Sequence, residues 1–236
     1  MGLPKLNNIP KYKAKIPSTG EEVSFRPFLV KEEKVMLLAL ESQDSSQVAT
    51  AIIDTVIACI DADITSKSLT SYDVEYLFLK IRAKSVGETS KLMLSCTSCK
   101  HENEVTVNVE DIKLDVKPTD NIIKITDMIS LEMKHPSFEM MAKNEQLSSD
   151  SPTSQIFGLI KESILAVVTE EERTLIIDTT NEEFQEFIES MTQDQFANIR
   201  EYIQSIPKLQ HTIKFKCVNC NHDNNITIEG LQSFLS

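Results

Sequence analysis

Apolar residues recur every three or four positions in several stretches of the chain, and this spacing predicts amphipathic helices. The stretch 47–60 is apolar around most of its circumference, so we expect it to lie centrally in a helical core. Thr180 and Thr192 each stand three positions before a Glu or Gln, the capping-box pattern of a helix start. The predicted helices cover residues 31–41, 47–60, 70–86, 137–145 and 154–168, and two more begin after Thr180 and Thr192.

Alternation of apolar and polar residues predicts three β-hairpins. The first joins residues 12–16 and 21–25 through a Pro-Ser-Thr-Gly turn, the second joins 91–95 and 104–109, and the third runs from 209 to 228. Short strands are also expected at residues 122–125, 129–133 and 174–177. Helices combined with short β-hairpins predict the α+β fold class.

These elements divide the chain into four predicted segments. They are an N-terminal arm and β-hairpin (1–28), a helical unit ending in the second hairpin (29–110), an extended linker region with short strands (111–153) and a helical unit ending in the third hairpin (154–236). The Ser-, Asp- and Pro-containing stretch 147–153 is the predicted flexible boundary. We expect the two helical units to pack as one domain.

The charge balance limits the classes of partner. Acidic residues outnumber basic ones by 36 to 24, which gives a net charge of −12. An acidic chain disfavours broad binding to the phosphate backbone of nucleic acids. No apolar run approaches the roughly 20 residues of a membrane-spanning helix, so we expect a soluble protein of the cytoplasm with no membrane partner.

Four of the five cysteines lie in two C-x-x-C turns, each at the tip of a predicted hairpin. A structural zinc ion binds four ligands at tetrahedral corners, often four thiolates, and one such turn supplies only two. We therefore predict that both turns together hold one structural Zn²⁺ through Cys96, Cys99, Cys217 and Cys220. Cys59 lies in an apolar run and is expected to be a buried core residue.

Two questions about these turns stay open. A redox C-x-x-C pair is the rival to zinc, although neither turn lies between a strand and a helix as in thioredoxin-like proteins. His101 and His222 each follow the second cysteine of a turn by two positions and are further candidate ligands. Because four cysteines already complete a tetrahedral set, we expect both histidines to be polar residues of the hairpin turns.

The two turns are separated by a constant offset of 121 residues. The offset pairs Cys96 with Cys217 and Leu92 with Ile213, and it also pairs Ser71 with Thr192, two candidate helix caps. Residues 70–109 therefore align with 191–230 without a gap, which predicts two pseudo-repeated helix-plus-zinc-hairpin units joined by one four-cysteine zinc site. Two unrelated hairpins of similar build are the alternative.

The sequence lacks the common catalytic signatures. It contains no phosphate-binding glycine loop, no G-x-S-x-G and no H-E-x-x-H motif. His135 and His211 are isolated, and the carboxylates follow solvated helix faces. These features predict a protein that is not an enzyme.

Two segments carry a resemblance to a known family. Residues 23–34, Val-Ser-Phe-Arg-Pro-Phe-Leu-Val-Lys-Glu-Glu-Lys, and residues 73–88, which lead into the first C-x-x-C turn, resemble the T4-like phage baseplate hub subunit, or baseplate hub assembly protein, family. The resemblance implies a non-enzymatic protein of contractile-tail phages that helps to build the baseplate hub. It implies other hub or tail proteins as partners, and a place in the host cell cytoplasm, with the virion tail as a further location.

Two other functions compete with this interpretation. A zinc-ribbon nucleic-acid-binding protein would use the lysines near the turns, Lys91, Lys100, Lys214 and Lys216. A general phage tail assembly chaperone is the second, because a strand followed by Phe-Arg-Pro and a helix recurs among such chaperones. The candidate contact surfaces are the helix end at Arg82–Lys84, the hinge Phe25–Phe28 and the methionine-rich middle, with Met128, Met133, Met140 and Met141.

Overall fold

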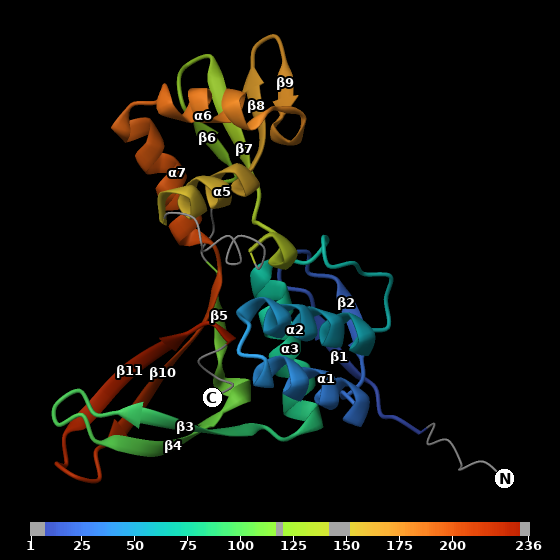
Figure 1. Ribbon diagram of the computed structural model, residues 1–236, viewed down its shortest axis with the longest axis vertical. Helices are drawn as coiled ribbons and strands as arrows, with labels where there is room; N and C mark the ends of the chain where they lie inside the picture. The colour runs from blue at the N-terminus through green and yellow to red at the C-terminus, as the bar shows by residue number, and fades with distance from the viewer. Residues whose placement is uncertain (1–7, 117–119, 142–151, 232–236) are drawn as a thin grey trace. The chain divides into compact units, whose positions relative to one another are not determined.

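The computed structural model describes residues 8–116, 120–141 and 152–231. The chain forms two compact units (Figure 1). Unit 1 contains Met1–Asp115 together with Lys208–Ser236, and unit 2 contains Val116–Pro207. In the described part of the chain, no helix is both long enough and apolar enough to cross a membrane.

Three helices form the helical part of unit 1. They are α1 (Val30–Glu41), α2 (Ser45–Cys59) and α3 (Ser71–Ser85). The side chains of Thr70 and Asp73 form a capping box at the start of α3, which satisfies backbone N–H groups that a helix start leaves unpaired. The core between the helices consists of fully buried aliphatic side chains, among them Val56, Val74, Leu77 and Ile81.

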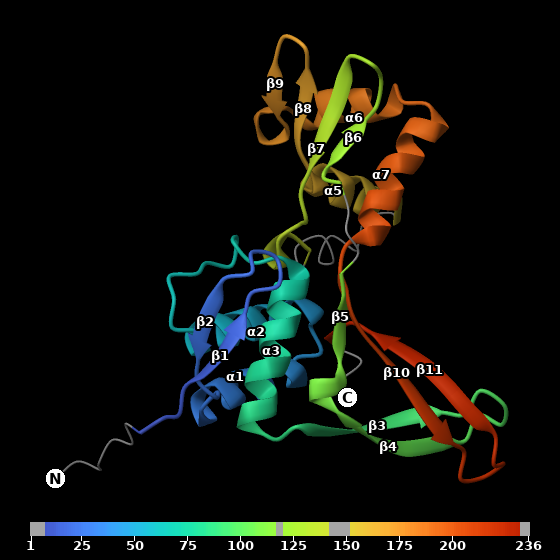
Figure 2. The ribbon, with the colours of Figure 1, turned by 180° about the vertical axis from the view of Figure 1, so that it is seen from behind.

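The first β-hairpin, β1 (Tyr12–Lys15) and β2 (Glu22–Phe25), is tied to these helices. In its turn, the backbone N–H and the hydroxyl of Ser18 donate to the Asp73 carboxylate at the start of α3, at 2.9 and 2.6 Å. The view from behind shows this hairpin beside α3 (Figure 2). Asp73 therefore caps the helix and anchors the hairpin at once.

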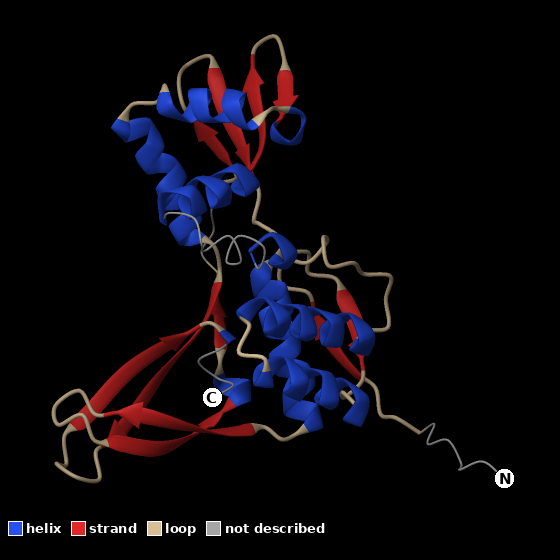
Figure 3. Cartoon of the chain, in the orientation of Figure 1, coloured by secondary structure: helices blue, strands red, loops and turns tan. Residues whose placement is uncertain are grey.

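Two longer hairpins complete unit 1 (Figure 3). Strands β3 (Thr89–Ser95) and β4 (Glu102–Asn108) pair along their whole length, and β11 (Asp223–Glu229) pairs with all but the first two residues of β10 (Lys208–Lys216). After the short 3-10 helix η1 (Val109–Asp111), strand β5 (Lys113–Asp115) pairs with β10. The C-terminal strands therefore belong to the same unit as the N-terminal helices.

Unit 2 is an antiparallel sheet with helices. Its strand order is β6-β7-β8-β9, with bounds Ile122–Lys124, Ile129–Met133, Ile164–Thr169 and Arg173–Leu175. The helices are α5 (Pro152–Ser163), α6 (Asn181–Glu189) and α7 (Gln193–Ser205), and η3 (Ile176–Asp178) is a 3-10 turn. Sheet and helices bury one core around Leu131, Ile160, Ile164 and Ile199.

The α+β class and the antiparallel hairpins agree with the sequence, but the predicted helix 154–168 is wrong in its second half. Helix α5 ends at Ser163, and Ile164–Thr169 form strand β8. This stretch is rich in β-branched residues and pairs with β7 on one side and β9 on the other. Helix and strand periods cannot be distinguished over so few apolar residues, and the sheet decides the conformation.

Two predicted features lie partly outside the residues that the structure describes. Residues 138–141 are helical, and the rest of the predicted helix 137–145 lies outside the described part of the chain. The predicted boundary at 147–153 lies there too, apart from its last two backbone positions. The compact units also differ from the predicted segments, because the segment 154–236 contributes residues to unit 2 up to Pro207 and to unit 1 from Lys208 onward.

Candidate metal centre

The two C-x-x-C turns have the same backbone conformation. In the first, the N–H of Cys96 donates to the carbonyl of His101 at 2.8 Å, and the N–H of Lys100 donates back to the carbonyl of Cys96 at 3.0 Å. In the second, the same pair of bonds joins Cys217, His222 and Asn221 at 2.9 and 3.0 Å. Lys100 and Asn221 are left-handed, with φ of 61° and 57°.

The left-handed residue turns the chain so that backbone N–H groups face the sulfurs. The N–H groups of Cys99 and Ser98 donate to the sulfur of Cys96. The N–H of His101 donates to the sulfur of Cys99, and the N–H of His222 donates to that of Cys220. Donors aimed at sulfur stabilise a thiolate more than a thiol, so the turns are built to hold negative charge.

The turns bring the four sulfurs together. The Sγ atoms of Cys96 and Cys220 are 3.7 Å apart, as are those of Cys99 and Cys217, and all four lie within 4.8 Å of one another. A disulfide would need a sulfur–sulfur distance of about 2.0 Å. A tetrahedral ion with metal–sulfur bonds of about 2.3 Å sets neighbouring sulfurs about 3.8 Å apart. The geometry therefore fits one metal ion rather than disulfide bonds.

The protonation of these cysteines points in the same direction. Hydrogen bonds to the Cys96 sulfur, of which that from the backbone N–H of Cys99 has the largest influence, outweigh burial and lower the pKa of Cys96 to about 6. At Cys220 the N–H of His222 favours the thiolate, but the neighbouring thiols of Cys99, Cys217 and Cys96 raise its pKa to about 12. Four sulfurs this close cannot all ionise without a cation between them, and a bound divalent metal ion would supply that charge.

Two asparagines lock the turns to each other. The side-chain oxygen of Asn103, on β4, accepts the backbone N–H of Val218 in the opposite turn at 3.0 Å. The side-chain oxygen of Asn224, on β11, accepts the backbone N–H of Thr97 at 2.9 Å. The nitrogens of Asn103 and Asn224 donate to the carbonyls of His101 and His222 in their own turns. Both side chains are 3 % exposed, so each exchanges hydration for a bridge between hairpins.

The reciprocal pattern is broken at two points. The hydroxyl of Thr97 adds a second bond to Asn224, whereas its counterpart Val218 has no hydroxyl. The nitrogen of Asn224 also lies 3.5 Å from the sulfur of Cys96, whereas that of Asn103 lies 3.4 Å from the carbonyl of Leu94. Cys96 therefore has the more strongly hydrogen-bonded sulfur environment.

Behind the turns, the hairpins share a small apolar core. Leu92, Val107 and Ile213 are buried there. Leu94, Val105, Phe215 and Ile228 pack against it and are partly buried. Cys96 and Cys217 are fully buried, while Cys99 and Cys220 are exposed. Each turn thus presents one inner and one outer sulfur.

The 121-residue offset holds for the hairpins but not for whole units. It places β3–β4 on β10–β11 and pairs Asn103 with Asn224. The helices differ, because α3 lies in unit 1 and α7 lies in unit 2. Thr70 rather than Ser71 caps α3, so the two caps are one position out of register. A repeat of complete helix-plus-hairpin units is not confirmed.

The other predicted residues have different surroundings. Within the described chain, the cluster of metal-binding groups contains the four cysteines and neither His101 nor His222. Cys59 is buried in the helical core, as predicted, and burial raises its pKa to about 11. Lys91 is paired with Glu104 at 2.8 Å. The sequence prediction missed Asn103 and Asn224, although their 121-residue separation was a usable signal.

One comparison with known proteins finds a relationship. A family model described as T4 bacteriophage base plate protein matches residues 9–236. Searches of curated proteins and of solved structures give no match.

Proposed function

Because the chain belongs to the T4 bacteriophage base plate protein family, we propose that it acts without catalysis, through protein–protein contacts, in the assembly or structure of the baseplate hub. One structural zinc ion, held by Cys96, Cys99, Cys217 and Cys220, stabilises it. The family indicates a structural or assembly role in the baseplate, with other tail or baseplate proteins as partners. Our proposal adds that the chain acts in the hub of the baseplate, that it binds one zinc ion and that it has no catalytic activity.

The geometry of the four sulfurs carries the zinc part of the proposal. Four thiolates complete a tetrahedral zinc site and leave no position for water or substrate, which favours a structural ion. The ion would join two hairpins whose shared core, as far as the structure describes the chain, has three buried side chains. We call this ion with its four cysteines the zinc clasp. Such a joint suits a protein that has to present contact surfaces in a fixed arrangement.

The family also supports a location. Baseplate proteins belong to the virion tail, and assembly would take place in the host cell cytoplasm before the tail is complete. A permanent part and a transient assembly factor differ in one observable property. The first is present in purified particles, and the second is present only in infected cells.

The competing nucleic-acid function receives less support. Lys91, one of the four lysines on which it depends, is occupied by an ion pair with Glu104, and the chain carries a net charge of −12. No observation specifically favours the general tail chaperone over the baseplate role.

A complementation experiment tests the baseplate role. A phage whose copy of this chain carries an early stop codon is grown on host cells that express the wild-type chain, the Cys96→Ser/Cys217→Ser chain or the control Val218→Ser. Val218 is exposed in the second turn and supplies no ligand. We expect complete tails with the wild-type and control chains and incomplete baseplates without the chain. Normal particles without any copy would contradict the role.

Cobalt substitution tests the coordination. Co²⁺ bound by four thiolates gives intense thiolate-to-metal absorption, which weakens as each sulfur is lost. We expect the full spectrum for the purified wild-type chain and a weaker one for Cys99→Ser. An unchanged spectrum for His101→Ala and His222→Ala would confirm that neither imidazole is a ligand, and a loss there would contradict the four-cysteine site.

A further inference from the structure

Helix α1 exposes several large apolar side chains, although the exposed positions of a helix are normally polar. Val35, Leu37, Leu38 and Leu40 are all at least 49 % exposed, and only Glu32 and Ala39 of the helix are buried. Exposed apolar side chains that gather in one place usually mark a binding site, and Leu37 and Leu40 line the same groove. The zinc clasp does not account for it, because none of these residues belongs to the shared core of the hairpins.

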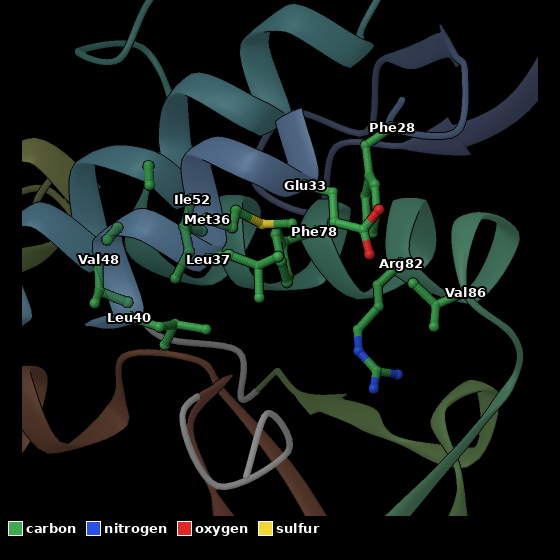
Figure 4. A pocket seen from close by; sticks show the side chains of 12 residues that line it. Phe28, Glu33, Met36, Leu37, Leu40, Val48, Ile52, Phe78, Arg82 and Val86 are labelled. Carbon is green, nitrogen blue, oxygen red and sulfur yellow. The ribbon is translucent and has the colours of Figure 1, made fainter. Parts of the chain in front are cut away.

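Part of this surface forms a groove of about 180 Å³ between α1, α2 and α3. Figure 4 shows Leu37 and Leu40 of α1, Phe78 of α3 and Arg82 of α3 around it. Leu37 and Leu40 are 54 % and 53 % exposed. Apart from Glu33 and Arg82, the lining side chains are apolar. The groove therefore combines exposed apolar side chains with a cation.

Arg82 is the unusual member of the lining. Its Nη1 is buried and has no hydrogen-bond partner among the described residues, while Nη2 lies 3.4 Å from the hydroxyl of Ser90. Burial lowers the pKa of Arg82, but an arginine stays charged in proteins. A buried donor on a charged group is costly when it is left unpaired. Because the Arg82 side chain lines the groove, a carboxylate that enters the groove and accepts a hydrogen bond from its guanidinium would be stabilised.

The neighbouring carboxylates do not fill this role. Glu32 accepts hydrogen bonds from Arg26 and from the backbone N–H of Leu29. Figure 4 shows the guanidinium of Arg82 directed away from the Glu33 carboxylate. Residues 232–236, Gln-Ser-Phe-Leu-Ser, contain no acidic side chain. A second copy of the chain would bring another net charge of −12, which disfavours self-association through a single cation.

We propose that this groove binds an amphipathic helix of another baseplate protein, with apolar side chains against Leu37 and Leu40 and one Asp or Glu carboxylate accepting a hydrogen bond from Arg82. An apolar helix face in a hydrophobic groove is a common mode of peptide recognition, with anchors at i, i+4 and i+7. The carboxylate fixes the direction in which the helix lies. The proposal deepens the baseplate role and rests on it.

The probe is a set of short fluorescent helical peptides with leucines at the anchor positions. The peptides differ only in the position of a single glutamate, and each has a matched peptide, its glutamine twin, in which glutamine replaces that glutamate. We expect one register to bind the purified full chain, and its glutamine twin to bind at least about tenfold more weakly. In Arg82→Gln the two twins should bind alike, because the charge pair is gone.

Surface variants locate the binding. Leu37→Asp should abolish it, whereas Val35→Asp should leave it unchanged, because Val35 is exposed on the same helix but does not line the groove. Circular dichroism and thermal unfolding verify that each variant is folded. If Arg82→Gln does not fold, Arg82→Lys keeps the charge and is expected to retain the preference for glutamate over glutamine.

Four results would overturn the proposal. They are the absence of binding by every peptide, equal binding of the glutamate and glutamine twins, self-association of the chain that Leu37→Asp disrupts, and binding that requires deletion of residues 232–236. The third assigns the groove to a second copy and the fourth to the chain itself. If Leu37→Asp supports normal baseplates while the stop-codon phage does not, the groove proposal fails and the baseplate role stands.

Discussion

Among the described residues, nine buried side chains from the sheet and helices of unit 2 form one core, whereas the apolar core that the hairpin pair of unit 1 shares has three. The hairpin pair has in addition the buried asparagine bridges and the cluster of four sulfurs. Small cores rarely stabilise a fold without a metal or disulfide. The same chain therefore combines a unit held by apolar burial with a hairpin pair whose four clustered sulfurs could hold a metal ion.

The largest effect is expected from loss of the clasp. Cys217→Ser, or removal of metal by a chelator, should unfold the hairpin pair, because the binding free energy of a structural metal is also folding free energy. Hydrogen exchange on the full chain should show lost protection in β3, β4, β10 and β11 and unchanged protection in unit 2. Val218→Ser is the control. Equal loss in both units would remove the distinction between them.

A substitution in the apolar core of unit 2 is expected to destabilise unit 2 and to leave the metal site intact. Leu131 is fully buried in its core, and Leu131→Ala should lower the free energy of unfolding of this unit by about 2–5 kcal/mol. Metal content should stay as in the wild type. Denaturant unfolding followed by hydrogen exchange separates the units, and a loss of metal in this variant would show that the clasp depends on the unit 2 core.

Loss of one asparagine bridge is expected to weaken metal binding less than loss of a cysteine does. Asn224→Ala leaves the N–H of Thr97 without its partner and removes a donor near Cys96. Such losses cost up to about 3 kcal/mol and should weaken metal binding measured by competition with a chelator. Asn225→Ala, at the exposed neighbouring position, is the matched control. A similar loss in both variants would place the effect in the strand rather than in the bridge.

The helical part of unit 1 should respond to acid through Glu32. Burial opposes its ionisation, but hydrogen bonds from Arg26 and from the Leu29 N–H lower its pKa to about 2 from 4.5. Because the folded pKa is depressed, the stabilisation is present above about pH 4.5 and is lost as the pH falls toward 2.

The expected loss is about 2 kcal/mol, measured as the stability of α1 by hydrogen exchange between these pH values. Glu32→Gln should be less stable at neutral pH and should lose less stability than the wild type over this range. The exposed Glu33→Gln serves as the control. A wild-type pH dependence in Glu32→Gln would assign the acid sensitivity to other groups, such as the thiolates.

Local patterns in the sequence predict most elements of the fold. Capping boxes at Thr180 and Thr192 mark the starts of α6 and α7, and alternation marks the hairpins. The pattern fails at Ile164–Thr169, where the neighbouring strands impose the sheet. It also cannot say that β10 pairs with β5, because such pairing depends on residues about a hundred positions apart.

For the candidate site, the spacing of the cysteines predicts which sulfurs come together. The 121-residue offset also relates Asn103 to Asn224, but it does not predict their bridges, because an asparagine in a strand looks like any polar residue until its burial is known. The groove escapes prediction for a related reason. The sequence marks Leu37 and Leu40 as apolar, but only the structure shows that no described neighbour covers most of their surface.

The zinc content of the purified full chain tests the central claim most directly. Inductively coupled plasma mass spectrometry should give one zinc ion per chain for the wild type, because both turns contribute to a single site. The Cys96→Ser/Cys217→Ser variant should give close to none. Two zinc ions per chain, none in the wild type, or an unchanged content in the variant would contradict a shared clasp.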